Sequence, residues 1–102
     1  MAHMQDNTYN GFFNRATWNV VLWIENDEPA HYFFRDLYQR FSENHGQDED
    51  DRSDMVRCTA HEWFGSSTPD GDRLEDADWA EVREVLDESY SDILDELFAE
   101  LA

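Results

Sequence analysis

The side chains most able to do chemistry in this sequence are one cysteine and four histidines. The histidines stand at positions 3, 31, 45 and 61 without a regular spacing, and Cys58 lies three residues before His61. This pair supplies at most half of the four ligands that a structural zinc ion requires. With no second cysteine, Cys58 cannot form an internal disulfide, and we expect it to be buried as a core residue. We predict no metal ion, no cofactor and no catalytic residue.

No catalytic motif accompanies these residues. The sequence lacks a glycine-rich phosphate loop, a serine or cysteine nucleophile motif and an acidic loop of the EF-hand type. The predicted function is therefore not enzymatic. A metal-dependent or substrate-binding enzyme stays open as a third alternative, which a closed pocket holding His31 or His61 beside carboxylates would support.

Carboxylates dominate the chemistry of the chain. The 102 residues include 25 acidic and seven basic side chains, with a formal net charge of −18, and every basic residue is arginine. Lysine is ordinarily among the commonest residues, so its absence indicates adaptation to molar salt, where the Debye length falls to about 3 Å and carboxylate repulsion is screened. Because no basic patch is present, we predict no direct binding to nucleic acid.

Mimicry of DNA is the second explanation of this charge. Residues 70–102 hold thirteen acids against two arginines. Duplex DNA carries one charge per about 1.7 Å of its axis, and a carboxylate face on a helix could imitate it, as in anti-restriction and anti-CRISPR proteins. The alternative function is thus a DNA-mimic inhibitor of a nucleic-acid-binding host protein. The candidate mimic face comprises Glu81, Glu84, Asp87, Glu88, Asp92, Asp95 and Glu96.

The elements that position these side chains are expected to form one all-α domain. A chain of this length buries roughly 60 to 65% of its unfolded surface in a single core. Residues 1–8 contain an Ala-His-Met junction typical of a tag remnant, and residues 9–102 are expected to form the helical domain. No apolar run approaches the roughly 20 residues of a membrane span. With no signal peptide either, we predict a cytoplasmic protein without membrane contact.

The first two helices are predicted from capping residues and apolar spacing. Asn14 is a suitable N-cap for a helix over residues 15–26, whose apolar residues cover most of its circumference and indicate burial. Its β-branched cluster leaves a central strand as the alternative. Asp27 and Pro29 favour a second helix start, and one apolar stripe follows: Ala30, Phe33, Phe34, Leu37, Tyr38 and Phe41.

The remaining helices follow a polar stretch. Residues 42–51, with their acidic run 48–51, are predicted to form an exposed linker, and a third helix is predicted over residues 53–64. Residues 66–72 are predicted to form a surface loop. Asp78 and Glu81 resemble a capping box that opens a last helix, which either runs to the end of the chain or breaks near residues 89–91. The inward side chains expected on the third helix are Val56, Thr59, Ala60, Trp63 and Phe64. The predicted fold is a compact bundle of about four helices.

Residues 14–28 carry a resemblance to a known family. Their sequence, NRATWNVVLWIENDE, resembles the signature N-R-x-T-W-N-V-x-L-W-I-x-N-D-E of small uncharacterised proteins carried by phages, plasmids and haloarchaea. Residues 9–11 upstream and Trp79, Glu81 and Val82 downstream also resemble the pattern of that family. Phe12 and Phe13 depart from it. The resemblance implies a helical fold and a mobile-element or haloarchaeal origin. It implies no activity.

The signature has two physical interpretations. Its tryptophans and aliphatic residues could be core, with its polar residues capping helix ends, which we favour. Alternatively it could form a partner-binding face, because tryptophan and arginine dominate interface hot spots. The candidate interaction residues are then Arg15, Trp18, Asn19 and Trp23. Because no enzymatic motif is present, we expect a protein-protein interaction module with an unknown protein partner, and a homodimer is an open alternative.

Overall fold

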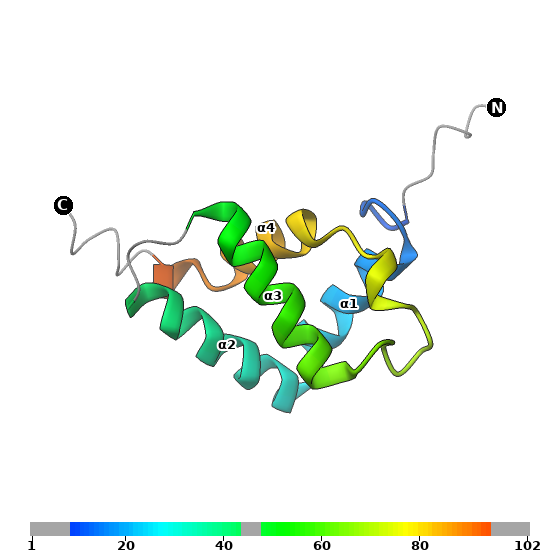
Figure 1. Ribbon diagram of the computed structural model, residues 1–102, viewed down its shortest axis with the longest axis horizontal. Helices are drawn as coiled ribbons and strands as arrows, with labels where there is room; N and C mark the ends of the chain where they lie inside the picture. The colour runs from blue at the N-terminus through cyan, green and yellow to red at the C-terminus, as the bar shows by residue number, and fades with distance from the viewer. Residues whose placement is uncertain (1–8, 44–47, 95–102) are drawn as a thin grey trace.

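The described part of the protein is entirely helical apart from turns and loops. The structure, a computed structural model, describes residues 9–43 and 48–94. Its elements are α1 (Arg15–Asn26), α2 (Glu28–Glu43), α3 (Glu49–Phe64), the short 3-10 helix η2 (Leu74–Asp76) and α4 (Trp79–Ser89). Figure 1 shows their arrangement. The predicted all-α bundle in one domain is confirmed, whereas the predicted tag remnant at 1–8 lies outside the described residues.

The first helix has the bounds that the sequence predicts. The Asn14 side chain accepts hydrogen bonds from the backbone N–H of Thr17, at 2.9 Å, and from its hydroxyl, at 2.6 Å. Val20 and Ile24 are fully buried in the core. The N-cap starts the helix and the apolar residues hold it in the core, so the strand alternative is wrong.

The second helix follows α1 after a single residue. The Asp27 carboxylate accepts a hydrogen bond from the backbone N–H of Ala30 at 3.2 Å, as a residue near a helix start commonly does. Its apolar stripe faces inward, although Phe33 is only half-buried. The buried members are Ala30, Phe34, Leu37, Tyr38 and Phe41.

The third helix begins four residues earlier than predicted. Asp48 is its N-cap, and the Asp48 carboxylate accepts a hydrogen bond from the Asp51 N–H at 2.9 Å. The acidic run is exposed, as expected, but it forms the first turn of α3 rather than a linker. Carboxylates in a first turn are stabilised by the positive end of the helix dipole. The prediction of a linker through residue 51 is therefore wrong.

Two side chains of α3 lie differently from the prediction. Val56, Thr59 and Ala60 are buried as expected, but Trp63 is 38% exposed and Cys58 is exposed. Cys58 stands two residues after Val56, which places it about 200° around the helix, away from the core. The expectation that Cys58 is buried is therefore wrong.

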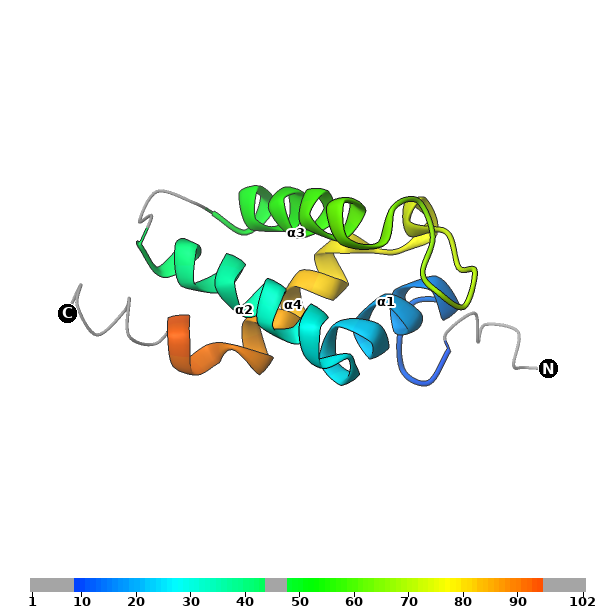
Figure 2. The ribbon, with the colours of Figure 1, turned by 90° about the horizontal axis from the view of Figure 1, so that it is seen from below.

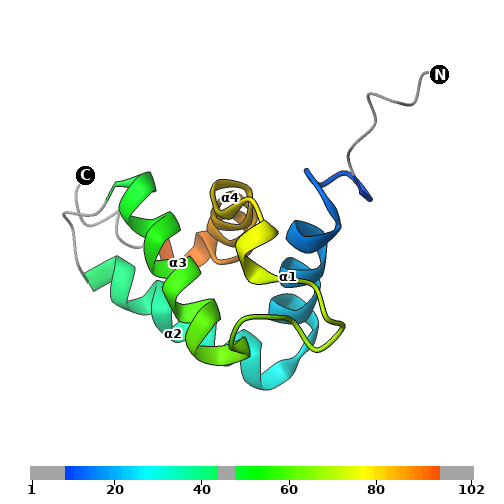
Figure 3. The same cartoon turned by 45° about the vertical axis from the view of Figure 1, so that its right-hand side comes forward.

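The last helix lies between two others. Figure 3 shows α4 nearly end-on between α3 and α1, and both helices contact it. Val82 and Leu86 of α4 are fully buried. In Figure 2, which views the molecule from below, α3 lies on the opposite side from the chain that follows α4. The core is therefore formed where α4 meets the inner faces of its neighbours.

The helical pattern after residue 79 is interrupted. The chain leaves the helix at Tyr90 and is helical again over residues 91–94, so of the two alternatives left open by the sequence the structure shows the break near residues 89–91. The Tyr90 hydroxyl lies 3.0 Å from Nδ1 of His31 and donates to the His31 carbonyl oxygen at 3.1 Å. Burial, with a smaller contribution from the charge of Glu25, raises the pKa of Tyr90 to about 12. Tyr90 thus ties this break to α2 as a neutral phenol at ordinary pH.

Among the described helices, none combines the length and the apolar character that crossing a membrane would need.

Candidate functional site

Three of the four candidate interaction residues bind the protein's own loop. Arg15, Asn19 and Trp23 stand four residues apart on one face of α1. The Arg15 guanidinium donates to Asp72 at 2.9 Å, and the Asn19 amide and the Trp23 indole N–H donate to the same oxygen of Asp70 at 2.8 and 3.0 Å. We call these five residues the α1 clasp. It fastens the segment that follows α3 to α1.

Burial separates the four candidate interaction residues. Asn19 is completely buried under the protein's own loop, whose Asp70 accepts a hydrogen bond from its amide. The Arg15 side chain is 52% exposed. Trp18 and Trp23 are both half-buried, and the ring of Trp18 packs on that of Tyr9 with centroids 5.0 Å apart. Of the four, Arg15, Trp18 and Trp23 keep surface that another molecule could reach.

Both α1 and the loop contribute charged side chains to the α1 clasp. Hydrogen bonds from Asn19 and then Trp23 hold the pKa of Asp70 below its ordinary value, with a further contribution from the charge of Arg15. The hydrogen bond and charge of Asp72 raise the pKa of Arg15. Asp70 is therefore ionised at neutral pH, and α1 binds it in that form.

The loop that carries Asp70 is a turn with a defined conformation. The Gly71 N–H donates to the Thr68 carbonyl at 2.8 Å, which closes a turn with Pro69 and Asp70 at its centre. Gly71 has φ of +95°, a value that glycine adopts without strain. Thr68 is buried and its backbone N–H donates to the Asp72 carbonyl at 2.8 Å. The predicted surface loop is confirmed, and its turn presents Asp70 to α1.

The start of α1 is also joined to the start of α4. The Asn14 amide donates to the Asp76 carbonyl at 2.8 Å, and the Asp78 N–H donates to the Thr17 hydroxyl at 2.9 Å. Asp78 caps α4 through the Glu81 N–H at 3.1 Å. The Glu81 carboxylate does not return to Asp78, as a capping box requires, and instead accepts the Phe13 N–H at 2.8 Å. The predicted capping box is therefore only half formed.

The fastened loop leaves a hollow beside the end of α3. The hollow has a volume of about 400 Å³, and we call it the aromatic groove. Its lining residues are Trp23, Asp27, Trp63, Phe64, Ser67 and Pro69.

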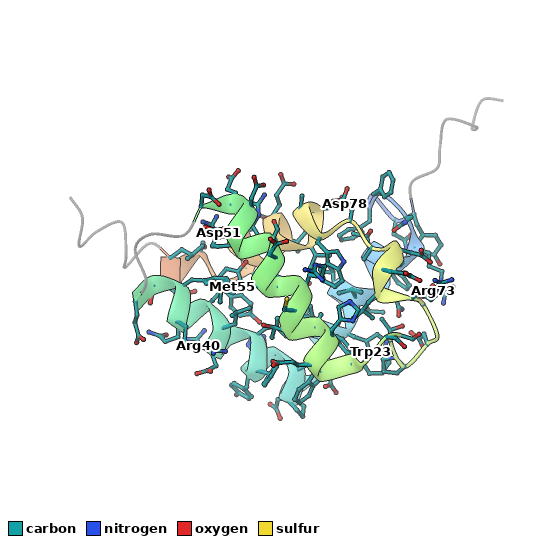
Figure 4. All side chains as sticks on the ribbon, in the orientation of Figure 1. Trp23, Arg40, Asp51, Met55, Arg73 and Asp78 are labelled. Atoms are coloured by element: carbon teal, nitrogen blue, oxygen red, sulfur yellow. The ribbon has the colours of Figure 1, made fainter. Side chains whose placement is uncertain are left out.

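The groove is built from aromatic side chains that support one another. Figure 4 shows Trp23 near the last turn of α3, which contributes Trp63 and Phe64 to the lining. Behind the lining, Phe33 of α2 stacks on Trp63 with ring centroids 4.8 Å apart. Of these residues, only Trp23 was a candidate from the sequence. Trp63 was assigned to the core by its helical spacing, which does not show where the inward face of the helix leaves the core.

A second hollow, of about 410 Å³, is lined by His61, Ser66, Ser67, Arg73 and Glu75. Arg73 and Glu75 form an ion pair, with side chains that are 64% and 59% exposed. The hollow is thus open, whereas the enzyme alternative called for a closed pocket. In the part of the chain that the structure describes, no group of three histidine, cysteine or acidic side chains is placed to hold a metal ion.

The candidate mimic face is divided. Glu84, Glu88 and Asp92 are exposed, whereas Asp95 and Glu96 lie outside the described residues. Asp87 is enclosed by partners: it accepts hydrogen bonds from Arg52 and Arg83, both at 2.9 Å, and from the Tyr38 hydroxyl at 2.7 Å. Asp87 therefore joins α4 to α2 and α3 within the bundle.

Exposed carboxylates also occur on every long helix. Examples are Glu25 on α1, Asp36 on α2, Asp54 on α3 and Glu84 on α4. The acidic charge thus surrounds the described part of the protein, whereas mimicry of a DNA strand calls for concentration on one face.

Comparison with known proteins places the chain in a family without assigning it a role. No curated protein and no solved structure matches the chain. One family does match, over residues 5–101. Because this match covers nearly the whole sequence, the chain belongs to that family, which is described as a family of unknown function (DUF7249).

Proposed function

We propose that the protein is a non-enzymatic, salt-adapted module that binds another protein in the cytoplasm, and that the aromatic groove is its binding site. The observation that carries this proposal is the hollow itself, in which Trp23, Trp63 and Pro69 meet at the surface. Concave sites lined by aromatic side chains with few polar groups are the usual form of binding pockets. Tryptophan is also the side chain most enriched in interface hot spots.

The α1 clasp gives the groove a fixed shape. The hydrogen bond from the Trp23 indole to Asp70 orients one wall, and the stacking of Phe33 on Trp63 supports the other. A site that is already ordered loses less conformational entropy when it binds. The polar residues of the signature therefore have a positioning role in this proposal, while Trp23 touches the partner.

DNA mimicry is the second candidate and has less support. Its strongest residues are the exposed Glu84, Glu88 and Asp92, but Asp87 between them is already paired with two arginines. Because exposed carboxylates occur on all four long helices, they do not single out one face as a binding surface. The test of the main proposal therefore includes variants of α4, the helix that carries Glu84 and Glu88.

The proposal predicts that a protein partner depends on Trp63. Immobilised wild type would be exposed to a host extract, and the proteins that it retains would be purified and their affinities for wild type and for each variant measured by calorimetry. We expect Trp63→Ala to weaken binding about 30-fold, the effect of losing a hot spot of about 2 kcal/mol. Tyr32→Ala is the matched control, because Tyr32 is 60% exposed and does not line the groove.

Three results would separate the candidates. Loss with Trp63→Ala and retention with Tyr32→Ala support the groove. Loss only with the double variant Glu84→Gln and Glu88→Gln supports mimicry by α4. A purified partner that binds all these variants equally would contradict both candidates.

Salt adaptation makes a separate prediction about stability. With a net charge of −18, the chain repels itself in dilute buffer. We expect its melting temperature, followed by circular dichroism, to rise steeply with KCl and to go on rising above about 1 M, where the Debye length is already only about 3 Å. A melting temperature that is high and flat from dilute buffer upward would contradict salt adaptation, and with it the haloarchaeal origin that the signature suggests.

A further inference from the structure

The groove combines three aromatic side chains with a carboxylate. None of its six lining residues is basic, and Asp27 is the charged one. Asp70, whose carboxylate lies 3.0 Å from the indole nitrogen of Trp23, places a second negative charge next to the same ring. Aromatic faces attract cations through the negative potential above the ring, and tryptophan does so best. The local chemistry therefore favours a positively charged occupant.

We propose that the aromatic groove binds an arginine or lysine side chain from a basic segment of the partner protein. This inference rests on the proposed function and names the chemistry of its partner. The methylene stem of such a side chain can pack on Trp63 and Phe64, while its charged head pairs with Asp27. Arginine suits the site especially well, because its flat guanidinium can stack on an indole and hydrogen-bond to a carboxylate at once.

The charge of the rest of the protein supports the same occupant. At moderate salt a net charge of −18 raises the rate of encounter with basic segments and repels acidic ones, whereas in molar salt only short-range contacts such as the pairing with Asp27 remain. A purely apolar segment would take the charged Asp27 carboxylate out of water with only the Ala30 N–H as its partner, which is unfavourable. The exposed carboxylates on all four long helices, which we call the acidic coat, attract a basic partner from any direction. A specific contact differs from this general attraction because it depends on the residues of the groove.

The test uses two short peptides that differ only in charge. One has a single arginine between glycine and serine residues, and the other has citrulline, which has nearly the same shape and no charge. Both would be titrated into the wild-type protein at moderate salt, and the indole N–H signals of its tryptophans would be followed by NMR. We expect saturable shifts at Trp23 and Trp63, with about tenfold tighter binding of the arginine peptide. Trp79 is the internal reference, because its indole N–H donates to the Leu74 carbonyl away from the groove.

A pair of single-charge variants separates the groove from the acidic coat. Asp27→Asn removes the charge of the groove, while the asparagine oxygen can still accept the Ala30 N–H. Glu28→Gln removes one charge from the next residue, which is exposed and does not line the groove. We expect Asp27→Asn to weaken the arginine peptide about fivefold and Glu28→Gln to change it less than twofold. Circular dichroism of each variant confirms that it is folded.

The outcomes distinguish this inference from the proposed function. Equal effects of Asp27→Asn and Glu28→Gln overturn it, because the peptide then senses only the coat. Equal shifts at Trp63 with both peptides also overturn it, yet leave the groove as a binding site. Absence of any shift at Trp23 and Trp63 overturns it as well, and the proposed function then rests on the capture experiment alone. A wild-type dimer that Trp63→Ala converts to a monomer would overturn it too, since the occupant would be a second copy of the chain.

Discussion

Replacement of Asp87 by alanine is expected to lower the free energy of unfolding by about 3 kcal/mol. The Asp87 carboxylate pairs with Arg52 and Arg83 at 2.9 Å each. The Arg83 side chain is only 8% exposed, so its charge would be left almost without solvent and without its main partner. Removing one member of a buried ion pair costs about 3 to 5 kcal/mol, and we take the lower end because Arg52 and Asp87 keep 18% and 19% of their side-chain surface.

The same variant also removes the acceptor of a buried phenol. The Tyr38 hydroxyl donates to Asp87 at 2.7 Å, and burial, reinforced by the negative charge of Asp87, raises the pKa of Tyr38 far above its ordinary value. Tyr38 is therefore a neutral donor at ordinary pH. In Asp87→Ala its hydroxyl keeps only the longer contact with the Arg83 carbonyl, at 3.3 Å. The weaker hydrogen bond left to this buried donor adds to the loss of stability.

Urea unfolding of Asp87→Ala and Glu88→Ala would measure the effect. Glu88 stands next in the sequence, is exposed, and was assigned to the same candidate mimic face, so its replacement is expected to change stability by less than about 0.5 kcal/mol. Similar stabilities of the two variants would show that the network around Asp87 contributes little. In that case Asp87 would again be a candidate residue of the mimic face.

Local signals predicted much of the fold. Asn14 and the residues after it define α1, because a cap and an apolar surface act within a few residues of each other. The start of α3 was missed because the acidic run 48–51 fits both a solvated linker and the first turn of a helix. Only packing of α3 on α4 decides between the two. Trp63 was misplaced for a related reason: it is the next-to-last residue of α3, where the inward face of the helix passes out of the core.

The candidate site was predicted only in part. The sequence drew attention to the face of α1 that carries Arg15, Asn19 and Trp23, but it did not identify what that face contacts. The partner of Asn19 is Asp70, which is 51 residues away in the sequence. No periodicity or composition connects residues so far apart. The groove has the same origin, since it exists only where α1, α3 and the loop meet.

The second large effect is expected from Asn19→Asp, which replaces an amide by a carboxyl group of the same shape. The Asn19 amide nitrogen donates to Asp70 at 2.8 Å, and the Asn19 carbonyl oxygen is buried without a hydrogen-bond partner in the described part of the chain. The new carboxyl would place a negative charge against the Asp70 carboxylate at a position with no exposed surface. A buried charge without compensation costs about 3 kcal/mol or more, so we expect a loss of that size at neutral pH.

The dependence of this loss on pH identifies its cause. Burial and the nearby charge of Asp70 would raise the pKa of the introduced carboxyl in the folded protein above its value in the unfolded chain. The folded state then binds the proton more tightly, so the loss of stability is small near the ordinary pKa of about 4 and grows as the pH rises toward neutrality. Asn26→Asp is the control, because it makes the same chemical change at an exposed position of α1.

Comparison of the two variants with wild type by urea unfolding, from mildly acidic to neutral pH, would test this explanation. Equal losses for Asn19→Asp and Asn26→Asp, or a loss that does not change with pH, would contradict it. If the loss does grow with pH, we expect the charged side chain introduced by Asn19→Asp to weaken the contact of the loop with α1, so that binding of the arginine peptide falls over the same pH range although no lining residue has changed. That joint result would tie the polar residues of the signature to the shape of the groove, because Asn19 touches the loop and has no surface left for a ligand.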